Sequence, residues 1–182
     1  ETNSRVGIAR KLSCLRSFYE YLCKRQLLSE NPVRLIDMPR LKEKAIIQLD
    51  PDEIASLLDY MENYGNGLTG VQLYHYNKQK YRDIAIVTLL LGTGIRVSEC
   101  VGLNISDVDF KNNGIRVLRK GGNEMVVYFG LEVEAALKDY LELSRNKITP
   151  LSGHENALFL SGQRKRISVD AIEKMVKKNS SA

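Results

Sequence analysis

The spacing of hydrophobic residues predicts a helix in the first quarter of the chain. Between Arg5 and Leu28 the apolar positions recur at steps of four, three, four and three, at Ile8, Leu12, Leu15, Tyr19 and Leu22. Positions spaced in this way lie on one face of a helix. Asn31-Pro32 ends the pattern, because proline has no N–H to donate and restricts the residue before it. A short apolar patch, Val33–Met38, follows.

A second helix is predicted to begin just after Asp50. Asp50 suits the N-cap, Pro51 the first helical position and Glu53 the capping-box position. The stretch Tyr64–Lys80 is rich in Gly, Asn and Tyr, and we interpret it as a loop. The buried face of the helix that begins after Asp50 is expected to hold Ile54, Leu57, Leu58 and Met61. Three tyrosines suit either base stacking or the more frequent role of packing, namely Tyr74, Tyr76 and Tyr81.

The nearly continuous apolar run Arg82–Leu91 fits either a buried helix or a strand. We favour a helix, because Gly92 at the end of the run suits a helix C-cap. Gly92-Thr93-Gly94 is a turn, and a short amphipathic segment with Cys100, Val101 and Leu103 follows it. Asn104–Asp109 is then expected to be a loop.

Two β-rich runs, 114–119 and 124–129, flank Lys120-Gly121-Gly122-Asn123, and the Gly-Gly pair predicts a hairpin with Lys120 at its tip. A short strand, Ala157–Leu160, is predicted to add to this hairpin. Leu131–Leu143 is predicted to be a helix, and Ser168 to cap a last one. The inward positions of the Leu131–Leu143 helix are Val133, Leu137, Tyr140 and Leu141. The predicted fold class is α+β, mainly helical, with a small antiparallel sheet.

The chain has 182 residues, enough for a domain with a proper core. It begins at Glu1 rather than Met, and we expect it to be a piece of a longer protein. No apolar run approaches the roughly 20 residues of a membrane span, and no secretion-type leader begins it. The cysteines lack zinc-ligand spacing and predict packing roles in a reducing cytoplasm, at Cys14, Cys23 and Cys100. His75 and His154 stand far apart, so no metal site is predicted.

The net charge of +5 is concentrated at the start of the chain. Residues 1–48 hold ten Lys or Arg and five Asp or Glu, whereas the other residues hold equal numbers of each. A basic segment attached to a neutral body fits a surface that faces a polyanion, or a well-solvated helix face. Within it, Arg40–Lys44 has the composition of a linker and is the best candidate for a domain boundary.

The stretch Gly92–Glu99 carries the candidate chemistry. If Arg96 begins a helix, Glu99 lies one turn along on the same face and can hold the guanidinium in one orientation. The guanidinium can then offer two parallel N–H donors to a phosphate. A solvated surface ion pair has the same spacing. A nucleotide-binding glycine loop at Gly92-x-Gly94 is a third interpretation, although Val97 stands where its third glycine belongs.

An ordered set of motifs resembles the tyrosine recombinase family. Leu12-Ser13-x-Leu15-Arg16-Ser17-Phe18-Tyr19-x-Tyr21-Leu22, Asn31-Pro32 and Pro39-Arg40-Leu41-Lys42 resemble the end of its core-binding domain. Thr93-Gly94-Ile95-Arg96-Val97-Ser98-Glu99 is similar to the motif of its first catalytic arginine. Lys120-Gly121-Gly122-Asn123-Glu124 is similar to its hairpin lysine motif, and Leu158-Phe159-Leu160-Ser161 to its third strand. The likeness covers essentially the whole chain in the same order.

The resemblance implies an integrase or transposon recombinase that breaks and rejoins DNA without a metal or nucleotide cofactor. A tyrosine forms a 3′-phosphotyrosyl link and releases a 5′-hydroxyl. Arg96 would stabilise the charge on the phosphate oxygens, with Glu99 orienting it, and Lys120 would supply a proton to the leaving oxygen. Double-stranded DNA would be the partner, bound by a homo-oligomer, a tetramer on paired sites. The candidate DNA contacts are Arg10, Lys11, Arg16, Lys42, Lys44, Arg119, Arg164 and Lys165.

The resemblance also implies a division into domains and an incomplete active site. Residues 1–38 would end a helical core-binding domain, 39–48 would form a basic linker, and 49–182 would begin the catalytic domain. The family's His-x-x-Arg motif and nucleophilic tyrosine have no counterpart among these residues, so we expect no DNA cleavage by this fragment alone. The alternative is a non-catalytic DNA-binding accessory or regulatory protein on the same scaffold.

Overall fold

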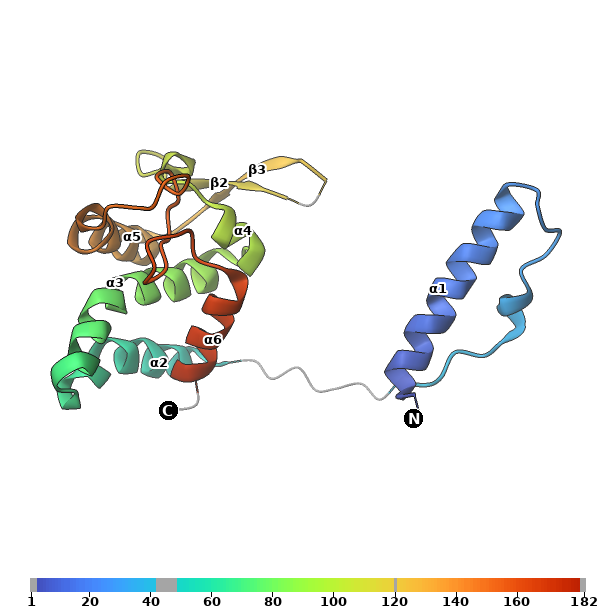
Figure 1. Ribbon diagram of the computed structural model, residues 1–182, viewed down its shortest axis with the longest axis horizontal. Coiled ribbons are helices and arrows are strands. Elements are labelled where there is room, and N and C mark those ends of the chain that lie inside the picture. The colour runs from blue at the N-terminus through green and yellow to red at the C-terminus, as the bar shows by residue number, and fades with distance from the viewer. Residues whose placement is uncertain (1–2, 42–48, 120, 181–182) are drawn as a thin grey trace. The chain divides into compact units, whose positions relative to one another are not determined.

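The computed structural model describes residues 3–41, 49–119 and 121–180, and it comprises two compact units, 1–48 and 49–182 (Figure 1). Each unit is described by itself. Lys42, Lys44 and Lys120, three of the predicted site residues, lie outside the described residues.

The first unit is one long helix followed by a short 3₁₀ helix. α1 spans Arg5–Lys24, and the hydroxyl of Ser4 caps it by accepting from the N–H of Gly7 at 3.1 Å. The predicted helix is therefore confirmed, although it ends before Leu28. The predicted apolar patch contains a 3₁₀ helix, η1 (Pro32–Leu35). Part of the predicted apolar face is exposed in this unit, namely Ile8 and Leu15, whereas Ala9 and Val33 are buried.

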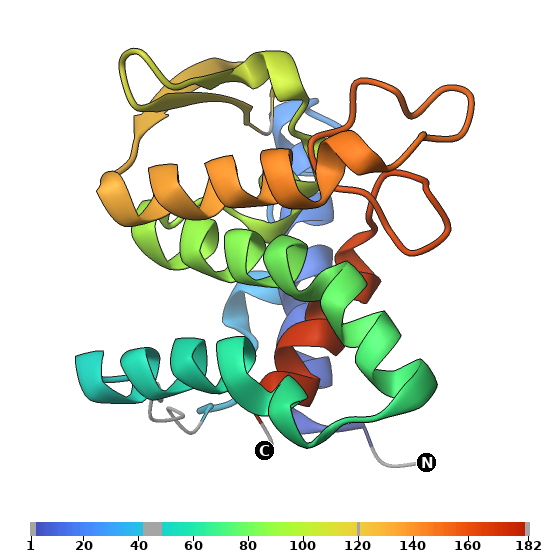
Figure 2. The same ribbon diagram turned by 90° about the vertical axis from the view of Figure 1, so that its left-hand side faces the viewer.

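The second unit is built mainly from helices. α2 (Pro51–Asn63) begins with the predicted capping box, in which Asp50 accepts from the N–H of Glu53 and Glu53 accepts from that of Asp50. α3 (Gly70–Thr93) follows a 3₁₀ helix, η2 (Tyr64–Gly67), and precedes the short α4 (Val97–Gly102). α5 (Leu131–Leu143) packs along α3 (Figure 2), and α6 (Val169–Asn179) begins after Ser168, as predicted. None of the described helices is long and apolar enough to cross a membrane.

The interpretation of Tyr64–Lys80 as a loop is wrong, because most of it forms the first half of α3. Tyr76 explains the difference. Its ring is buried, and its hydroxyl donates to the carbonyls of Met61, at 3.2 Å, and Glu62. The ring lies against Gly65, where an added Cβ would come within 2.0 Å of it. Packing between α2, η2 and α3 thus supports a helix whose own residues favour it weakly.

The sheet is a three-stranded antiparallel meander in the order β1–β2–β3. β2 (Gly114–Leu118) pairs with β3 (Glu124–Tyr128), with Arg116 opposite Val126, and this confirms the predicted hairpin. Gly121 and Gly122 both have positive φ angles, of 98° and 82°, which the turn requires. The predicted loop after α4 is instead a 3₁₀ helix, η3 (Ile105–Asp107), followed by the short strand β1 (Val108–Asp109), which pairs with β2.

The prediction that Ala157–Leu160 adds a strand to the hairpin is wrong. These residues form only two isolated bridges, from Asn104 to Ala157 and from Leu160 to Arg166. All four residues of the segment are buried, so both of its faces pack in the core. The segment passes beside the end of α4, where the N–H of Leu158 donates to the carbonyl of Leu103 at 3.0 Å.

The core of the second unit lies where α3, α4, α5, α6 and the inner face of the sheet meet. Its apolar side chains come from every one of these elements, as predicted for Val133, Leu137 and Tyr140. The fold is thus mainly helical with a small antiparallel sheet, as the sequence predicts. The most completely buried residues include Ile86, Leu89, Leu103, Ile115, Leu137, Leu158 and Ile172.

Candidate functional site

The turn between α3 and α4 sets the position of the candidate site. Gly94 takes a left-handed conformation, with φ of 64°, and its N–H donates to the carbonyl of Leu90 at 3.0 Å. The C-cap of α3 is therefore Gly94, two residues after the predicted cap at Gly92. Gly92 stays within α3, where an added Cβ would lie 2.6 Å from Val133. Because Gly92 lies within a helix and no strand leads into Gly94, the nucleotide-binding loop is excluded.

Arg96 is the N-cap of α4, and its extended backbone aims the side chain away from the core. Glu99 accepts two hydrogen bonds from it, one from the backbone N–H at 2.9 Å and one from Nη1 at 2.8 Å. The Glu99 side chain is only 5% exposed, whereas that of Arg96 is 69% exposed. The carboxylate thus binds the guanidinium through Nη1, while Nε and Nη2 have no acceptor among the described residues.

Glu99 is held in its charged form by the groups around it. The pKa of its carboxyl is lowered, first by the backbone N–H of Arg96 and then by the Arg96 guanidinium, against the opposing effect of burial. The positive charge of Arg119 lowers this pKa further. The buried carboxylate is thus bonded to Arg96 and lies within electrostatic range of Arg119.

The lowered pKa predicts a pH dependence of stability. A carboxyl whose pKa is lower in the folded than in the unfolded protein contributes stability above its unfolded pKa, near 4.5, and loses it as the pH falls through the folded value. We therefore expect the difference in unfolding free energy between the unmodified chain and Glu99→Gln to be constant near neutral pH and to shrink below pH 4.5. Urea denaturation at several pH values measures it. A difference that grows toward acid pH would contradict the proposed ion pair.

Arg119 lies directly after β2, at the start of the hairpin turn. Its N–H donates to the carbonyl of Asn123 at 2.9 Å, and its own carbonyl accepts from Gly122 at 3.1 Å. A cavity of about 510 Å³ between α4, η3 and the hairpin is lined by residues of all three, including Glu99, Leu118 and Glu124. The hairpin therefore faces α4 and its carboxylate. Lys120 is the residue that follows Arg119, and its predicted role stays a prediction.

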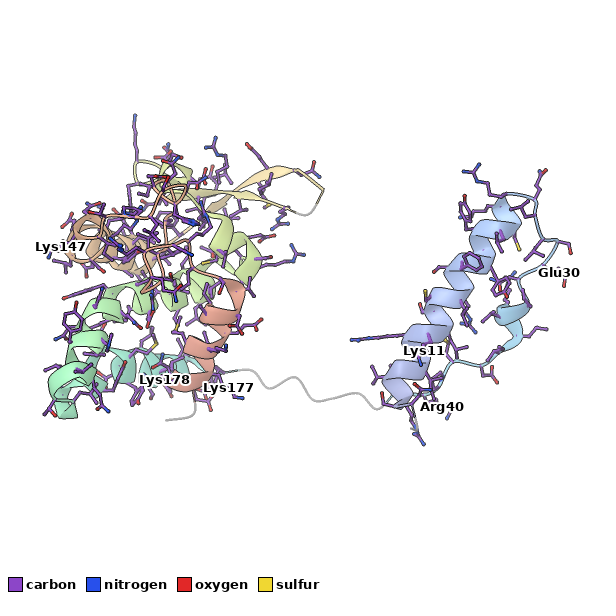
Figure 3. All side chains as sticks on the ribbon, viewed as in Figure 1. Lys11, Glu30, Arg40, Lys147, Lys177 and Lys178 are labelled. Carbon is purple, nitrogen blue, oxygen red and sulfur yellow. The ribbon has the colours of Figure 1, made fainter. Side chains whose placement is uncertain are left out.

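The predicted DNA contacts of the first unit differ in their surroundings. Lys11 lies on α1 (Figure 3), and its ammonium donates to the side chain of Asn3 at 2.7 Å. Arg10 is exposed on the same helix. Arg16 is half-buried, and its guanidinium donates to the carbonyls of Val33, at 3.3 Å, and Ile36. Arg16 thus fastens η1 to α1, a use that the pattern of charges did not predict.

Arg164 and Lys165 lie on a tight exposed turn. The N–H of Arg164 donates to the carbonyl of Ser161 at 2.9 Å, and the N–H of Ser161 donates to that of Lys165 at 2.7 Å. Arg164 has a φ of 62°, a left-handed conformation that side chains rarely adopt. Both side chains are free to meet a solvent-side partner, and the structure does not bring them into contact with Glu99.

Three arginines that the sequence did not single out donate to backbone carbonyls that are distant in the chain. Arg82 pairs with Asp83 at 2.6 Å and donates to the carbonyl of Leu160. Arg145 donates to the carbonyls of Glu155 and Ala157. Arg166 donates to the end of α4. No pattern in a single sequence distinguishes such an arginine from a solvated one, because its acceptors are backbone atoms distant in the chain.

The cysteines and histidines offer no second site. Cys100 is buried, and burial raises the pKa of its thiol to about 12, so it is a packing residue. Cys14 is exposed, which contradicts the packing role predicted for it. Within the described ranges, no group of three or more His, Cys, Asp or Glu residues could hold a metal ion.

Comparison with known families identifies the second unit. The family model described as "Phage integrase family" matches residues 48–182. The chain belongs to the phage integrase family. The matched region contains the Arg96–Glu99 pair and the hairpin.

The curated relatives of this phage integrase family chain are tyrosine recombinases. It is 35% identical over 181 residues to "Tyrosine recombinase XerC" of Caldanaerobacter subterraneus subsp. tengcongensis, covering 98% of the chain and 45% of the relative. It is 34% identical over 196 residues to "Tyrosine recombinase XerS" of Streptococcus thermophilus, covering 97% and 55%. The chain thus spans about half the length of the curated relatives it matches.

Solved structures of DNA-bound integrases share the fold. The Tn1549 transposon integrase in complex with transposon right end DNA aligns with a TM-score of 0.69 and 25% identity, over 99% of this chain and 60% of the integrase. A lambda integrase tetramer bound to a Holliday junction aligns with a TM-score of 0.60 and 14% identity, over 93% of this chain and 45% of that one. The second likeness shows the fold alone.

Proposed function

We propose that the chain is part of a site-specific DNA recombinase, in which Arg96 binds the phosphate at which a DNA strand is cut. One observation carries the proposal. Glu99 is buried and accepts two hydrogen bonds from Arg96, which leaves the rest of the guanidinium exposed and fixed in direction. This arrangement is what phosphate recognition by arginine needs, because a pre-oriented fork loses little freedom on binding. The pair also lies in the part of the chain matched by the family model.

The proposed reaction uses no metal or nucleotide cofactor. A tyrosine oxygen from the remainder of the protein attacks the phosphorus, the bond to the 5′ oxygen breaks, and the phosphodiester is kept as a 3′-phosphotyrosyl link. Negative charge grows on the non-bridging oxygens, where Arg96 stabilises it. Lys120, the residue after Arg119 in the sequence, gives a proton to the leaving 5′ oxygen. Arg119, at the end of β2, supplies a further phosphate contact.

We propose double-stranded DNA as the partner of the whole protein, and a tetramer on paired sites as its working form. The DNA-bound integrases and the lambda integrase tetramer that share this fold support both points. Arg10, Lys11, Arg164 and Lys165 are exposed cations suited to phosphate contacts. Arg16 uses Nε and Nη2 to hold η1 and its C-cap, which leaves Nη1 for a phosphate contact. No observation favours the non-catalytic accessory protein.

The dependence of DNA affinity on salt tests the proposal. Each phosphate contact that a protein loses reduces the slope of log affinity against log salt by about 1. We expect Arg96→Ala to show this reduction with a fluorescein-labelled duplex. Lys138→Gln removes one positive charge from α5, where Lys138 pairs with Glu134, and serves as the charge-matched control. Equal slopes for Arg96→Ala and the unmodified chain would contradict the proposed contact.

A second expected result concerns the chemistry itself. The 182 residues contain no His-x-x-Arg motif, and Tyr140 is the last tyrosine. Tyr140 is 1% exposed, and its hydroxyl donates to the carbonyl of Leu158 at 3.1 Å, so it cannot reach a phosphate. We expect no covalent adduct between the chain and DNA when the chain is incubated with nicked duplexes. In such a duplex the short fragment released by cleavage diffuses away, so any covalent link would accumulate. A tyrosine-linked product, detected by denaturing electrophoresis, would show that one of the tyrosines in these 182 residues is the nucleophile and would contradict the proposal.

A further inference from the structure

Arg166 connects the basic turn before α6 to the end of α4. One of its terminal nitrogens, Nη1, donates to the carbonyls of Val101 at 2.9 Å and Leu103 at 2.6 Å. The other, Nη2, donates to the side chain of Asn104 at 2.6 Å. The side chain is half-buried, and its acceptors lie more than sixty residues back in the sequence. Arg166 therefore occupies carbonyls at the C-terminal end of α4, which the helix itself leaves without partners.

α4 depends on side-chain contacts at its two ends. It has six residues, too few to be stable by its own hydrogen bonds. At its first turn Glu99 accepts from Arg96, and at its last turn Arg166 donates to the carbonyls. A cation at the C-terminal end of a helix also complements the helix dipole. The two ends of α4 are thus each fixed by a charged side chain.

We propose that Arg166 is a positioning residue for Arg96, acting through α4 and making no contact with DNA of its own. The inference rests on the proposed function of Arg96. By fixing the last turn of α4, Arg166 sets the direction in which the first turn presents the Arg96 guanidinium. It also ties the turn that carries Arg164 and Lys165 to the same helix, so that these cations keep a constant place relative to Arg96.

Arg145 provides the comparison that separates positioning from general support. Like Arg166, it donates to two backbone carbonyls, but these belong to Glu155 and Ala157 in the irregular segment before α6. It makes no hydrogen bond to α4 among the described residues. Loss of either arginine should lower stability, but only loss of Arg166 should act through Arg96.

A double-mutant cycle on the affinity for a fluorescein-labelled duplex tests the inference. Arg96→Ala is expected to weaken binding about tenfold in moderate salt. Arg166→Gln is expected to weaken binding about threefold in the unmodified chain and by less than about twofold in the Arg96→Ala background, since residues that act through one another are not additive. Arg145→Gln should have equal effects in both backgrounds. Arg166→Lys keeps the charge without the planar guanidinium. Its affinity for the duplex should lie between those of the unmodified chain and of Arg166→Gln.

The outcomes separate this inference from the proposed function. An equal effect of Arg166→Gln in both backgrounds, while Arg96→Ala still weakens binding, overturns the positioning role and leaves the function standing. A lower salt slope for Arg166→Gln in the Arg96→Ala background shows a direct DNA contact and also overturns it. No effect of Arg96→Ala itself contradicts the proposed function. Circular dichroism at the assay temperature checks that each variant is folded before its affinity is compared with that of the unmodified chain.

Discussion

Replacing Arg96 with alanine in a full-length protein that contains this chain should slow DNA cleavage about 100- to 1,000-fold. That is the usual cost of removing one pre-oriented donor from a site where negative charge develops. Binding of the duplex should weaken far less, because the other phosphate contacts remain. The rate of phosphotyrosyl formation in a single turnover measures the effect.

Arg96→Lys and Lys138→Gln are the controls for this prediction. Lysine keeps the charge of Arg96 but cannot reproduce the fork held by Glu99, so we expect it to recover only part of the rate. Lys138→Gln should cleave at the unmodified rate, because its side chain pairs with Glu134 on α5. An Arg96→Ala protein that cleaves as fast as Lys138→Gln would show that the exposed guanidinium has no part in the reaction.

Phe159→Ala should destabilise the second unit by about 3–5 kcal/mol, the usual cost of removing a buried aromatic ring. Phe159 is 1% exposed and stacks on Tyr140, with ring centroids 5.3 Å apart. The second unit of the variant should still unfold in a single cooperative transition, because the segment that contains Phe159 links the end of α4 to the core. Urea denaturation followed by circular dichroism measures the change.

Leu131→Ala is the matched control for Phe159→Ala. Leu131 begins α5 and is 77% exposed, so its truncation should change the unfolding free energy by less than about 0.5 kcal/mol. Phe159→Leu, which keeps most of the apolar volume, should cost less than the alanine variant. Equal stability of Phe159→Ala and Leu131→Ala would contradict the placement of Phe159 in the core.

Local signals predicted the elements whose stability is local. The capping box at Asp50 and Glu53 fixes the start of α2 by neighbouring atoms alone, and the Gly121-Gly122 pair fixes the hairpin turn in the same way. The first half of α3 was missed because Tyr76 gains its stability from carbonyls of α2 and from the space above Gly65. Such contacts between distant residues leave no periodic signal.

The candidate site was predictable to a similar degree. The three-residue spacing of Arg96 and Glu99 indicated a pair, and the structure adds that Glu99 is buried and that its two bonds fix the arginine from one side. The uses of Arg16, Arg145 and Arg166 could not be predicted, because each binds carbonyls brought near by folding. The segment Ala157–Leu160 has the composition of a strand, but the core buries it on both faces.

We propose that Arg96 and Lys120 bind one phosphate together. Nitrogen-15 NMR of their side chains during titration with inorganic phosphate tests it most directly, with Arg10 as an exposed arginine outside the site. We expect the Arg96 and Lys120 signals to shift with a single dissociation constant, and Lys120→Ala to weaken the response of Arg96. If Arg96 responds to phosphate no more than Arg10 does, or responds equally with and without Lys120, the two side chains do not form one phosphate site.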